Sequence, residues 1–438
     1  MGNSSSRDLE LKKQTVFNSW VYRIPALFYS EDQTLLAFAE KRTGQDDTSS
    51  KHLVMKTGTL KEENSQKTIE WSDFKEVKEA HLHGYRPMNP CPVYDRDNQT
   101  LFLFFTCVEG TVSEQWQINN RTNKTRLCFV TTTDTGHSWS AVTDLTDRLS
   151  EIRQWATFAV GPGHGIQTDS GRLIVPLYAY CISTLCCSST PYVFCLYRDK
   201  NDSNWQLGKP LKKNSLECEM AEVSDGKLYC NARSKGGYRV EALDMETLEE
   251  THKLVETGGG CQGSVVSFPA QRQAADCETK WLLFSHPTDQ SKRINLGLYL
   301  NKSPTNPKAW SKPWTINSGP SGYSDLAHIG DGWFVCLLEC GKKTETEQIV
   351  SVVFSNFYSC VVESTMTSCI TATLLLRTAV ACREWLRRLR GSPGYHCPLC
   401  RASTTTESTG ELPPCSETPP IHNTDCSHFY PQAGGTEV

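Results

Sequence analysis

The sequence predicts an all-β chain that folds as a six-bladed β-propeller of four-stranded antiparallel blades. Between residues 33 and 356, short β-rich runs alternate with turn residues, and no long helical period interrupts them. These runs are too numerous for a single sandwich, and radial repetition of four-stranded sheets would bury them without exposed edges. A turn motif at residues 132–139 supports the same architecture directly.

The expected strands are runs of β-branched, aromatic and aliphatic residues, and turn-forming residues separate them. In chain order they are 34–40 (TLLAFAE), 52–56 (HLVMK), 101–108 (LFLFFTCV), 126–133 (RLCFVTTT), 172–180 (RLIVPLYAY), 192–197 (YVFCLY), 281–287 (WLLFSHP), 296–300 (LGLYL), 332–339 (GWFVCLLE) and 349–355 (IVSVVFS).

The turn motif fits the pattern Ser/Thr-x-Asp-x-Gly-x-x-Trp, which is an Asp-box. Asp134 is expected to bond the turn amides, Gly136 to supply a positive φ, and Trp139 to pack between strands. The motif therefore predicts a structural hairpin rather than a chemical site. Degenerate copies of the motif are expected at Asp199 to Trp205, Asp244 and Trp310.

Composition divides the chain into a tail at 1–14, the propeller at 15–356, and a second tail at 357–438. Ser, Thr and Pro become common in the second tail, and its composition offers little core, so we expect it to be disordered. The apolar run at 367–382 is shorter than the ~20 residues that a membrane-spanning helix needs, and it contains Arg377.

His396, Cys397 and Cys400 resemble half of a zinc knuckle, but no second pair stands at a workable distance. We therefore expect neither a metal site nor another cofactor. The formal net charge of -4 provides no basic face for nucleic acid, so no nucleic-acid partner is expected.

The 20 cysteines are irregularly spaced, and the first twenty residues lack the apolar stretch of a signal peptide. We expect reduced thiols and a cytoplasmic chain. Residues Met1 to Ser6 fit the N-myristoylation pattern with Gly2 as the acceptor, which predicts peripheral association with a membrane surface. Basic residues or a second lipid would have to assist, and a plain polar tail is the alternative.

Several segments together resemble the vertebrate sialidase (neuraminidase) family. They are YRIP at 22–25, FAEKR at 38–42, GYRPMNPCP at 84–92, WATFAVGPGHGIQ at 155–167, LECEMAEV at 216–223, NARS at 231–234 and GYSDL at 322–326. They occur in the family's order, and the resemblance lies nearest the plasma-membrane, ganglioside-cleaving branch. It implies an exo-α-sialidase that acts on sialylated glycolipids (gangliosides), with glycoproteins or oligosaccharides as further candidate substrates.

The resemblance assigns Arg23, Arg233 and Arg293 to the triad that binds the sialic acid carboxylate. Arginine suits this task because its planar guanidinium binds carboxylates bidentately and never loses its charge. The assignment of Arg293 depends on local register, because Lys292 precedes it. Surface ion pairs are the alternative role for all three arginines.

The family nucleophile corresponds to Tyr323. A neutral phenol can approach an anomeric carbon that bears a carboxylate, whereas Asp or Glu would be repelled, and sialidases are the tyrosine exception among glycosidases. Glu217 matches the glutamate that serves as base to this tyrosine, with Glu219 and Glu222 as close rivals. A buried structural tyrosine is the alternative.

The family places its general acid seven residues after the glutamate of FAE-x-R, which gives Asp47. Asp46 precedes it, and a loop difference of one residue would exchange the two. In the absence of the surrounding motif, an Asp-Asp pair would be interpreted as a solvated turn.

The resemblance implies further substrate contacts. Arg42 would touch the carboxylate or a ring substituent, Tyr178 and Tyr180 the glycerol chain and pocket, and Met88, Asn89 and Glu114 the N-acyl group and rim, while Glu339 would orient the first arginine. Strand alternation and burial are the structural alternatives for the tyrosines and Met88. His164 is expected to be a hydrogen-bonded structural histidine.

Two functions of the propeller remain open from the sequence, beside a third interpretation in which the chain is an interaction protein that acts through a zinc-binding tail. The first is hydrolysis of terminal α-linked sialic acid with retention. The second is a propeller that binds sialoglycans without cleaving them, which would follow if the loop at 43–51 or the C-terminal end had disabled catalysis.

Overall fold

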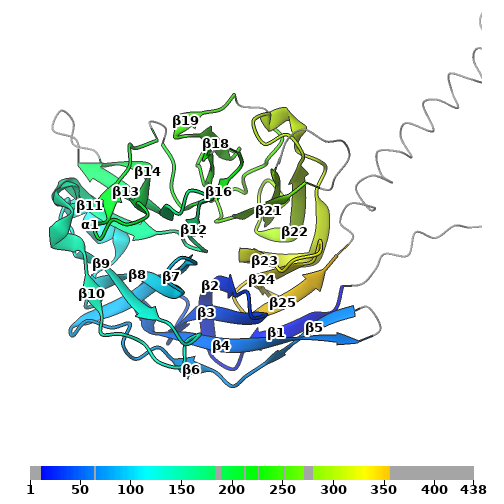
Figure 1. Cartoon of the computed structure of the whole chain (residues 1–438). Coiled ribbons are helices and arrows are strands. Elements are labelled where there is room, and N and C mark those ends of the chain that lie inside the picture. Colours follow the sequence, from blue (N-terminus) through cyan, green and yellow to red (C-terminus); the bar gives the residue numbers. More distant parts are fainter. Residues whose placement is uncertain are drawn as a thin grey trace, which may run out of the picture. The chain divides into compact units, whose positions relative to one another are not determined.

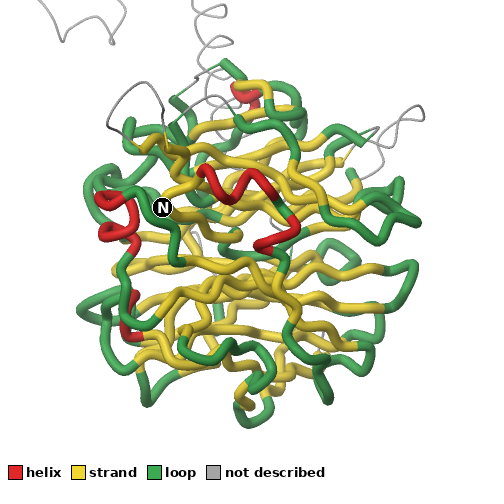
Figure 2. The backbone as a smooth tube through the Cα atoms, turned by 90° about the vertical axis from the view of Figure 1, so that its left-hand side faces the viewer, coloured by secondary structure: helices red, strands yellow, loops and turns green. Residues whose placement is uncertain are grey.

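The computed structural model describes residues 11–355, apart from 64–65, 183–188, 212–213, 225, 250–251 and 271–279. The described residues lie in one compact unit, Met1–Cys369, whereas the second unit, Ile370–Val438, lies outside them. Strands make up most of the described chain, and the helical segments are short (Figure 2). The predictions for Gly2, the zinc half-knuckle, the apolar run and the C-terminal tail all fall outside the described residues.

The strands form five hydrogen-bonded sheets in which every described pairing is antiparallel. The first sheet contains β2 (Val21–Tyr29), β3 (Thr34–Arg42), β4 (Ser50–Glu63), β5 (Gln66–Trp71) and β6 (Lys75–Glu76). The second contains β7 (Tyr85–Asp95), β8 (Thr100–Glu109), β9 (Thr125–Thr132) and β10 (Thr143–Asp144).

The third sheet contains β11 (Trp155–Val160), β12 (Ile166–Gln167), β13 (Leu173–Ile182), β14 (Ser189–Arg198) and β15 (Gln206–Leu207). The fourth contains β16 (Cys218–Glu222), β17 (Leu228–Ala232), β18 (Val240–Leu243) and β19 (Glu246–Thr247). The helical segments are α1 (Glu114–Asn120), η1 (Asp47–Ser49), η2 (Thr146–Arg148), η3 (Ser150–Gln154) and η4 (Pro307–Ala309).

The fifth sheet joins both ends of the described chain. Its strands, in spatial order, are β1 (Lys13–Phe17), β25 (Gln348–Phe354), β24 (Phe334–Cys340), β23 (Trp314–His328), β22 (Ile294–Asn301), β21 (Lys280–Pro287) and β20 (Ser264–Pro269). β1, near the start of the described chain, pairs with β25 near its end. Both ends of the described chain therefore lie in this one sheet.

The sheets are arranged like the blades of a propeller (Figure 1). Six strands contact one another around a common centre, in the closed order β2, β7, β12, β16, β20, β23 and back to β2. Of these, β20 and β23 both belong to the fifth sheet. We call these six the inner strands. The mainly-β, propeller-like prediction is therefore confirmed.

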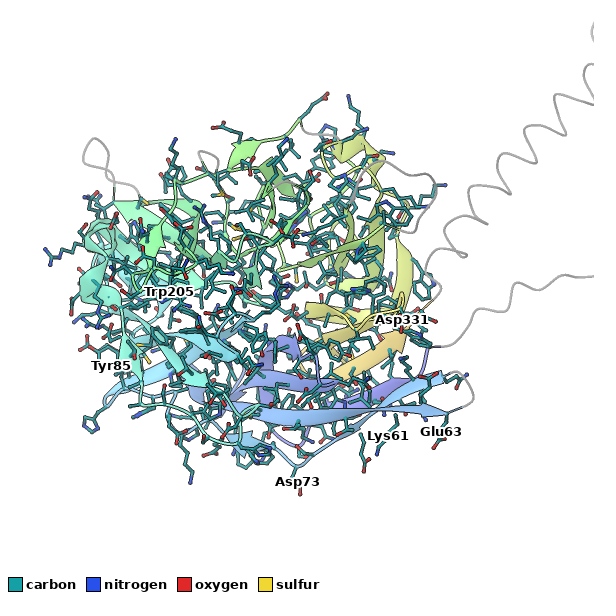
Figure 3. The ribbon with its side chains drawn as sticks, in the orientation of Figure 1. Lys61, Glu63, Asp73, Tyr85, Trp205 and Asp331 are labelled. Carbon is teal, nitrogen blue, oxygen red and sulfur yellow. The ribbon has the colours of Figure 1, made fainter. Side chains whose placement is uncertain are left out.

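The core consists of apolar layers between neighbouring sheets. Trp205 packs edge-on against Phe104, with ring centroids 4.8 Å apart, and lies between sheets, whereas Lys61 and Glu63 lie at the outer edge (Figure 3). A strand sandwiched in this way has two buried faces, so its sequence is continuously apolar rather than alternating. This explains runs such as β8, in which residues 101–108 are all buried.

The Asp-box forms the expected hairpin turn. Asp134 accepts a hydrogen bond from the Ser138 amide at 2.9 Å, and Gly136 has a φ of 78°. Trp139 packs edge-on against Phe38 of the neighbouring sheet, with centroids 6.2 Å apart. The motif therefore fastens the second sheet to the first, and its predicted structural role is confirmed.

The ten cysteines in the described part of the chain are free thiols, nine of them buried. Within the same residues, none of the helices has the length and apolar character needed to cross a membrane.

Candidate active site

Three of the inner strands are irregular at one end of the propeller centre. The pairing register shifts between Arg23 and Ala26 in β2, between Met88 and Cys91 in β7, and between Ser321 and Ser324 in β23. Positive φ angles occur at Ile24 (60°) and Asn89 (56°) within two of these irregularities. Such conformations cost about 1–3 kcal/mol each and are typical of functional sites.

The three predicted arginines meet at Tyr323, which lies in β23. The guanidinium carbons of Arg23 and Arg293 lie 5.5 Å and 5.4 Å from the centroid of its ring. Arg233 donates a hydrogen bond to the Tyr323 hydroxyl at 3.2 Å. Three guanidinium groups from distant parts of the chain therefore surround one phenol. Their positive charges repel one another, so this arrangement needs compensating partners.

Glu339 links the first arginine to the tyrosine. Its carboxylate accepts hydrogen bonds from the Arg23 side chain at 2.7 Å, from the Ile24 amide at 2.9 Å, and from the Tyr323 amide at 3.1 Å. The carboxylate is fully buried, so these charge-assisted bonds compensate for its lost hydration. Glu339 thus holds β2 and β23 together at the site.

Glu217 lies immediately before β16 and accepts the hydrogen bond of the Tyr323 hydroxyl. It also pairs with Arg233 at 2.7 Å. Burial raises the pKa of Tyr323 well above its ordinary value and the charge of Glu217 raises it further, while Arg233 and Arg293 lower it. The phenol is therefore neutral at physiological pH and already bonded to an acceptor for its proton.

The rival glutamates lie elsewhere. Glu219 bonds Ser264 at 2.8 Å and the Val265 amide at 2.9 Å, and Glu222 pairs with Lys280 at 2.7 Å. Lys292, the neighbour of Arg293, donates its amide to Asp289 on an exposed turn.

Asp47 begins η1, and its side chain is 68% exposed. It accepts a hydrogen bond from Arg42 at 2.8 Å, and its charge helps to raise the pKa values of Arg23 and Glu114. An accessible carboxyl group thus lies close to the arginine cluster. Asp46 stands one residue earlier, where its side chain makes no capping bond.

Arg42, a predicted substrate contact, is held by two carboxylates of the chain itself. Its side chain is fully buried and forms ion pairs with Glu40 at 2.6 Å and with Asp47. Direct contact with a ligand would require these pairs to open. The geometry instead suits Arg42 to holding the Asp47 loop.

Glu114 and the two strand tyrosines form a second group at the site. The Tyr178 hydroxyl donates to Glu114 at 2.9 Å, and the rings of Tyr178 and Tyr180 lie 6.4 Å apart. Glu114 is exposed at the start of α1, yet neighbouring protein atoms desolvate its carboxylate. This desolvation, together with the charges of Glu217 and Asp47, raises its pKa to about 7.

Met88 and Asn89 lie at the β7 irregularity and are nearly buried. The backbone N–H of Asn89 donates to the Glu40 carboxylate at 2.7 Å. This bond links β7 to the carboxylate that pairs with Arg42. Asn89 thus helps to support the Asp47 loop through Glu40 and Arg42, and it is also one of the residues predicted to line the pocket.

The opposite ends of the inner strands line a separate cavity of about 500 Å³. All six inner strands contribute to it, through Leu27, Pro92, Ile166, Ala221, Val265 and Leu326. His164 lies in its lining and bonds Asp325 at 2.6 Å. The prediction of a hydrogen-bonded structural histidine is therefore confirmed.

Potential metal ligands also meet here, because donor atoms of His164, Glu219 and Asp325 lie within 4.8 Å of one another. Asp325 already accepts hydrogen bonds from the Leu27 amide at 2.6 Å and from Ser264 at 3.0 Å. Hydrogen bonds thus occupy these carboxylates, and the cluster needs no ion to stabilise it.

His164 should make stability depend on pH. Burial alone would lower its pKa from 6.5, but the charges of Asp325 and Glu219 outweigh burial and raise the pKa to about 9. Its stabilising effect is fully present below pH 6.5 and is lost as the pH rises through about 9. We expect the free energy of unfolding to fall by on the order of 3 kcal/mol between pH 6.5 and about 9, as measured by urea unfolding.

His164→Gln should flatten this pH profile, whereas His137→Gln, on the exposed Asp-box turn, should leave it unchanged. An unaltered profile in the His164 variant would contradict the assignment.

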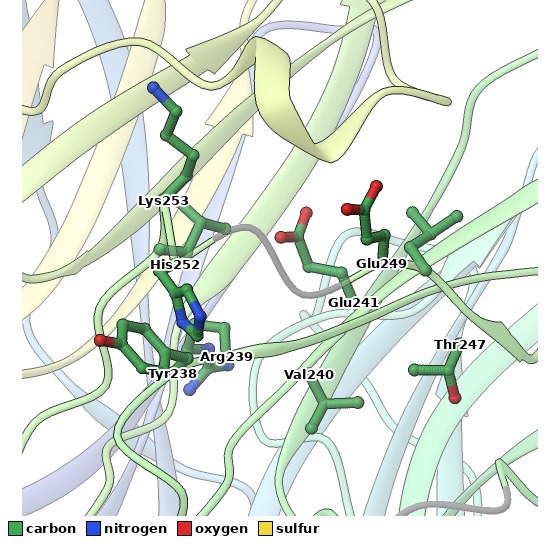
Figure 4. Close-up of a pocket in the computed structure, with 10 residues that line it drawn as sticks. Tyr238, Arg239, Val240, Glu241, Thr247, Glu249, His252 and Lys253 are labelled. Atoms are coloured by element: carbon green, nitrogen blue, oxygen red, sulfur yellow. The ribbon is translucent and has the colours of Figure 1, made fainter.

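A much smaller cavity lies beside the fourth sheet (Figure 4). Its lining includes Tyr238, Arg239, Glu241, His252 and Lys253. Its volume of about 10 Å³ suffices for roughly one water molecule. It contains none of the predicted substrate contacts.

The sequence did not predict two backbone contacts at the site, which involve the carbonyl oxygens of Gly259 and Gly260. Arg233 donates to the carbonyl oxygen of Gly259 at 2.6 Å, and Arg293 donates to that of Gly260 at 2.8 Å. The triple glycine at 258–260 was the available signal, since such a run marks a backbone that must approach its neighbours closely.

Comparison with known proteins shows which proteins this chain resembles. Residues 33–336 match the family model of the BNR repeat-like domain. The chain is 41% identical to Sialidase-3 of Rattus norvegicus over 404 residues, which cover 81% of this chain and 96% of the relative. It is 43% identical to Sialidase-2 of Cricetulus griseus over 366 residues, which cover 79% and 95% respectively.

Among solved structures, the Hadza microbial sialidase Hz136 has the same fold. Its TM-score is 0.63 at 18% sequence identity, and the match covers 77% of this chain and 66% of that one. The close sequence matches extend over most of this chain and nearly all of the mammalian relatives. The chain therefore belongs to the sialidase family of glycoside hydrolases.

Proposed function

We propose that this chain is an exo-α-sialidase that hydrolyses terminal α-linked sialic acid with retention of configuration, with Tyr323 as its nucleophile. The observation that supports this most strongly is the convergence of Arg23, Arg233 and Arg293 on Tyr323 while its hydroxyl bonds Glu217. A substrate whose anomeric carbon bears a carboxylate needs cations and a neutral nucleophile together, and this site provides both.

In the proposed first step, the Tyr323 oxygen attacks the anomeric carbon and its proton passes to Glu217. The glycosidic bond breaks, and the carboxylic acid of Asp47 protonates the departing oxygen. In the second step, Asp47 takes a proton from water, whose oxygen displaces the phenolate, and Glu217 returns a proton to Tyr323. Two displacements at one carbon retain its configuration.

The remaining residues have proposed supporting roles. Arg42 orients Asp47, and Glu339 orients Arg23. Tyr178 and Tyr180 would contact the glycerol chain, and Met88, Asn89 and Glu114 the N-acyl group and rim. At neutral pH Glu114 would be partly protonated, because its pKa is about 7, and could donate as well as accept hydrogen bonds.

We propose gangliosides as the preferred substrates, with glycoproteins and oligosaccharides as further possibilities. Large exposed apolar side chains support a peripheral contact with membranes: Trp116 lies in α1 near Glu114, and Trp20 lies three residues before Arg23. Indole rings favour the boundary between water and lipid. Myristoylation of Gly2 on a cytoplasmic chain remains part of this proposal.

We also propose six blades. The ring of six inner strands supports this count, as does the length of β23, which pairs with β22 through its first half and with β24 through its second. One long strand would thus serve two adjacent four-stranded blades.

The full chain should release sialic acid from both a mixed-micelle ganglioside and a fluorogenic α-sialoside. Proton NMR of the first product should show the α-anomer, since the mechanism retains configuration. Release of the β-anomer first would contradict the double displacement. Retention of the protein on immobilised sialoglycan without any release would instead favour a non-catalytic binding propeller.

A further inference from the structure

The segment Glu256–Cys261 lies between two of the site arginines. Arg233 donates to the carbonyl of Gly259 at 2.6 Å, and Arg293 donates to the carbonyl of Gly260 at 2.8 Å. Two consecutive backbone acceptors thus bind two guanidinium groups that would otherwise repel each other. Each bond fixes one N–H group of a guanidinium and thereby limits the direction of the others.

A buried carboxylate holds this turn in shape. Glu256 is 1% exposed, and one of its oxygens accepts the amides of Thr257 and Cys261, both at 3.0 Å. The Gly260 amide closes the turn by donating to the Thr257 carbonyl at 2.8 Å. The conformation of the loop therefore depends on this one side chain.

Glu256 is in turn fixed by a buried cation. Arg239 donates to Glu256 at 2.8 Å and, from the same nitrogen, to the Cys261 carbonyl at 2.6 Å. Burial would raise the pKa of Glu256, but Arg239 and the hydrogen bonds from His286 and Ser234 outweigh burial and lower it. The carboxylate is thus held ionised inside the fold.

The loop also reaches the proposed nucleophile, since Cys261 packs with Ile24 and Tyr323 in one small apolar cluster. The following residue, Gln262, accepts the Ser324 amide at 3.0 Å. The loop therefore touches the strand of Tyr323 as well as both arginines.

We infer that the loop Glu256–Cys261 is a positioning element that aims Arg233 and Arg293 at the substrate carboxylate, and that Glu256 is its organising residue. This inference rests on the proposed function, in which these arginines bind that carboxylate. Neither Glu256 nor the glycines need touch the substrate, because they act through the guanidinium groups.

Gly260 offers a sharp test. Its φ is 74°, and a Cβ atom built on it would lie 2.5 Å from Nε and 3.0 Å from Cγ of Arg233. Gly260→Ala should therefore turn Arg233 away from its present direction. The matched control is Gly330→Ala, where φ is 85° and nothing lies within 4 Å of the added atom. Both variants share the backbone strain, but only one disturbs an arginine.

The readout is the binding of two unreactive sialic acid analogues to the full chain by calorimetry, one with its carboxylate and one with a carboxamide in that position. For Gly260→Ala we expect the dissociation constant of the carboxylate analogue to rise about tenfold or more, and that of the carboxamide to change less than about threefold. Gly330→Ala should match the wild type for both analogues.

An equal loss for both analogues would mean general damage to the pocket and would overturn the inference, as would no loss for either. If Gly260→Ala does not fold, Glu256→Gln serves instead. It keeps the shape of the side chain but weakens its pair with Arg239, and the same selective loss is expected. Because binding is measured, the inference can hold even if the wild type releases no sialic acid, which would count against the proposed function alone.

Discussion

Replacement of Tyr323 by Phe should lower kcat for every α-sialoside by at least about 10³-fold while changing KM by less than about tenfold. The substitution removes only the oxygen that would bond the anomeric carbon. The arginines that surround the ring keep their own partners, Glu339 for Arg23 and Glu217 for Arg233. Steady-state kinetics with a fluorogenic sialoside would measure both constants.

Tyr299→Phe is the matched control, because Tyr299 is also a buried strand tyrosine but packs in an apolar cluster away from the arginines. Its kcat should remain within about twofold of the wild type. A 3-fluorosialyl fluoride should add one fluorosialyl group to the wild type, detectable by mass spectrometry, and none to Tyr323→Phe. Wild-type turnover by the phenylalanine variant would exclude Tyr323 as nucleophile.

Much of this arrangement could be predicted because its physical signals are local. Strands buried on both faces produce continuous apolar runs, and β8 and β13 fall close to the runs expected at 101–108 and 172–180. The Asp-box is equally local, since all its hydrogen bonds lie within a few residues of Asp134. Such patterns need no knowledge of the tertiary structure.

The choice among the three glutamates required tertiary structure. Glu217 and Tyr323 are 106 residues apart in the chain, and alternation along a strand predicts that Glu217 and Glu219 share a face. Glu217 lies just outside β16, however, and the two side chains reach different partners. The period of two alone therefore cannot show which of the two glutamates reaches Tyr323.

Arg42 and the loop Glu256–Cys261 show two further reasons why a sequence alone does not predict every role at the site. An arginine in a site motif looks the same whether it touches the ligand or holds a loop, and its ion pairs with the buried Glu40 and with Asp47 appear only in the structure. The loop Glu256–Cys261 accepts from Arg233 and Arg293 through backbone carbonyls. Every residue has such a group, so the triple glycine at 258–260 could mark a close approach of the backbone but not its arginine partners.

Replacement of Asp47 by Asn should affect the two chemical steps differently for substrates with poor and with good leaving groups. A ganglioside has a poor leaving group, so loss of the acid should lower kcat/KM about 10²-fold or more. An aryl sialoside leaves without much protonation, so its kcat/KM should fall less than about tenfold. Its kcat should still fall strongly, because water then lacks a base in the second step.

Asp46→Asn provides the matched control within the same loop, since it removes the same charge one residue earlier. The Asp46 side chain makes no capping bond, whereas Asp47 is held by Arg42 at 2.8 Å. We therefore expect the Asp46 variant to keep both constants within about twofold for both substrates. The reverse pattern would transfer the acid–base role to Asp46, and an equal loss for both substrates in Asp47→Asn would indicate damage to the loop rather than loss of a proton donor. Arg42 pairs with the Asp47 side chain at 2.8 Å, and Asp46 has no such pair among the described residues. The ratio of kcat/KM for the ganglioside to that for the aryl sialoside, compared between the two variants, therefore tests whether this ion pair marks the residue that transfers the proton.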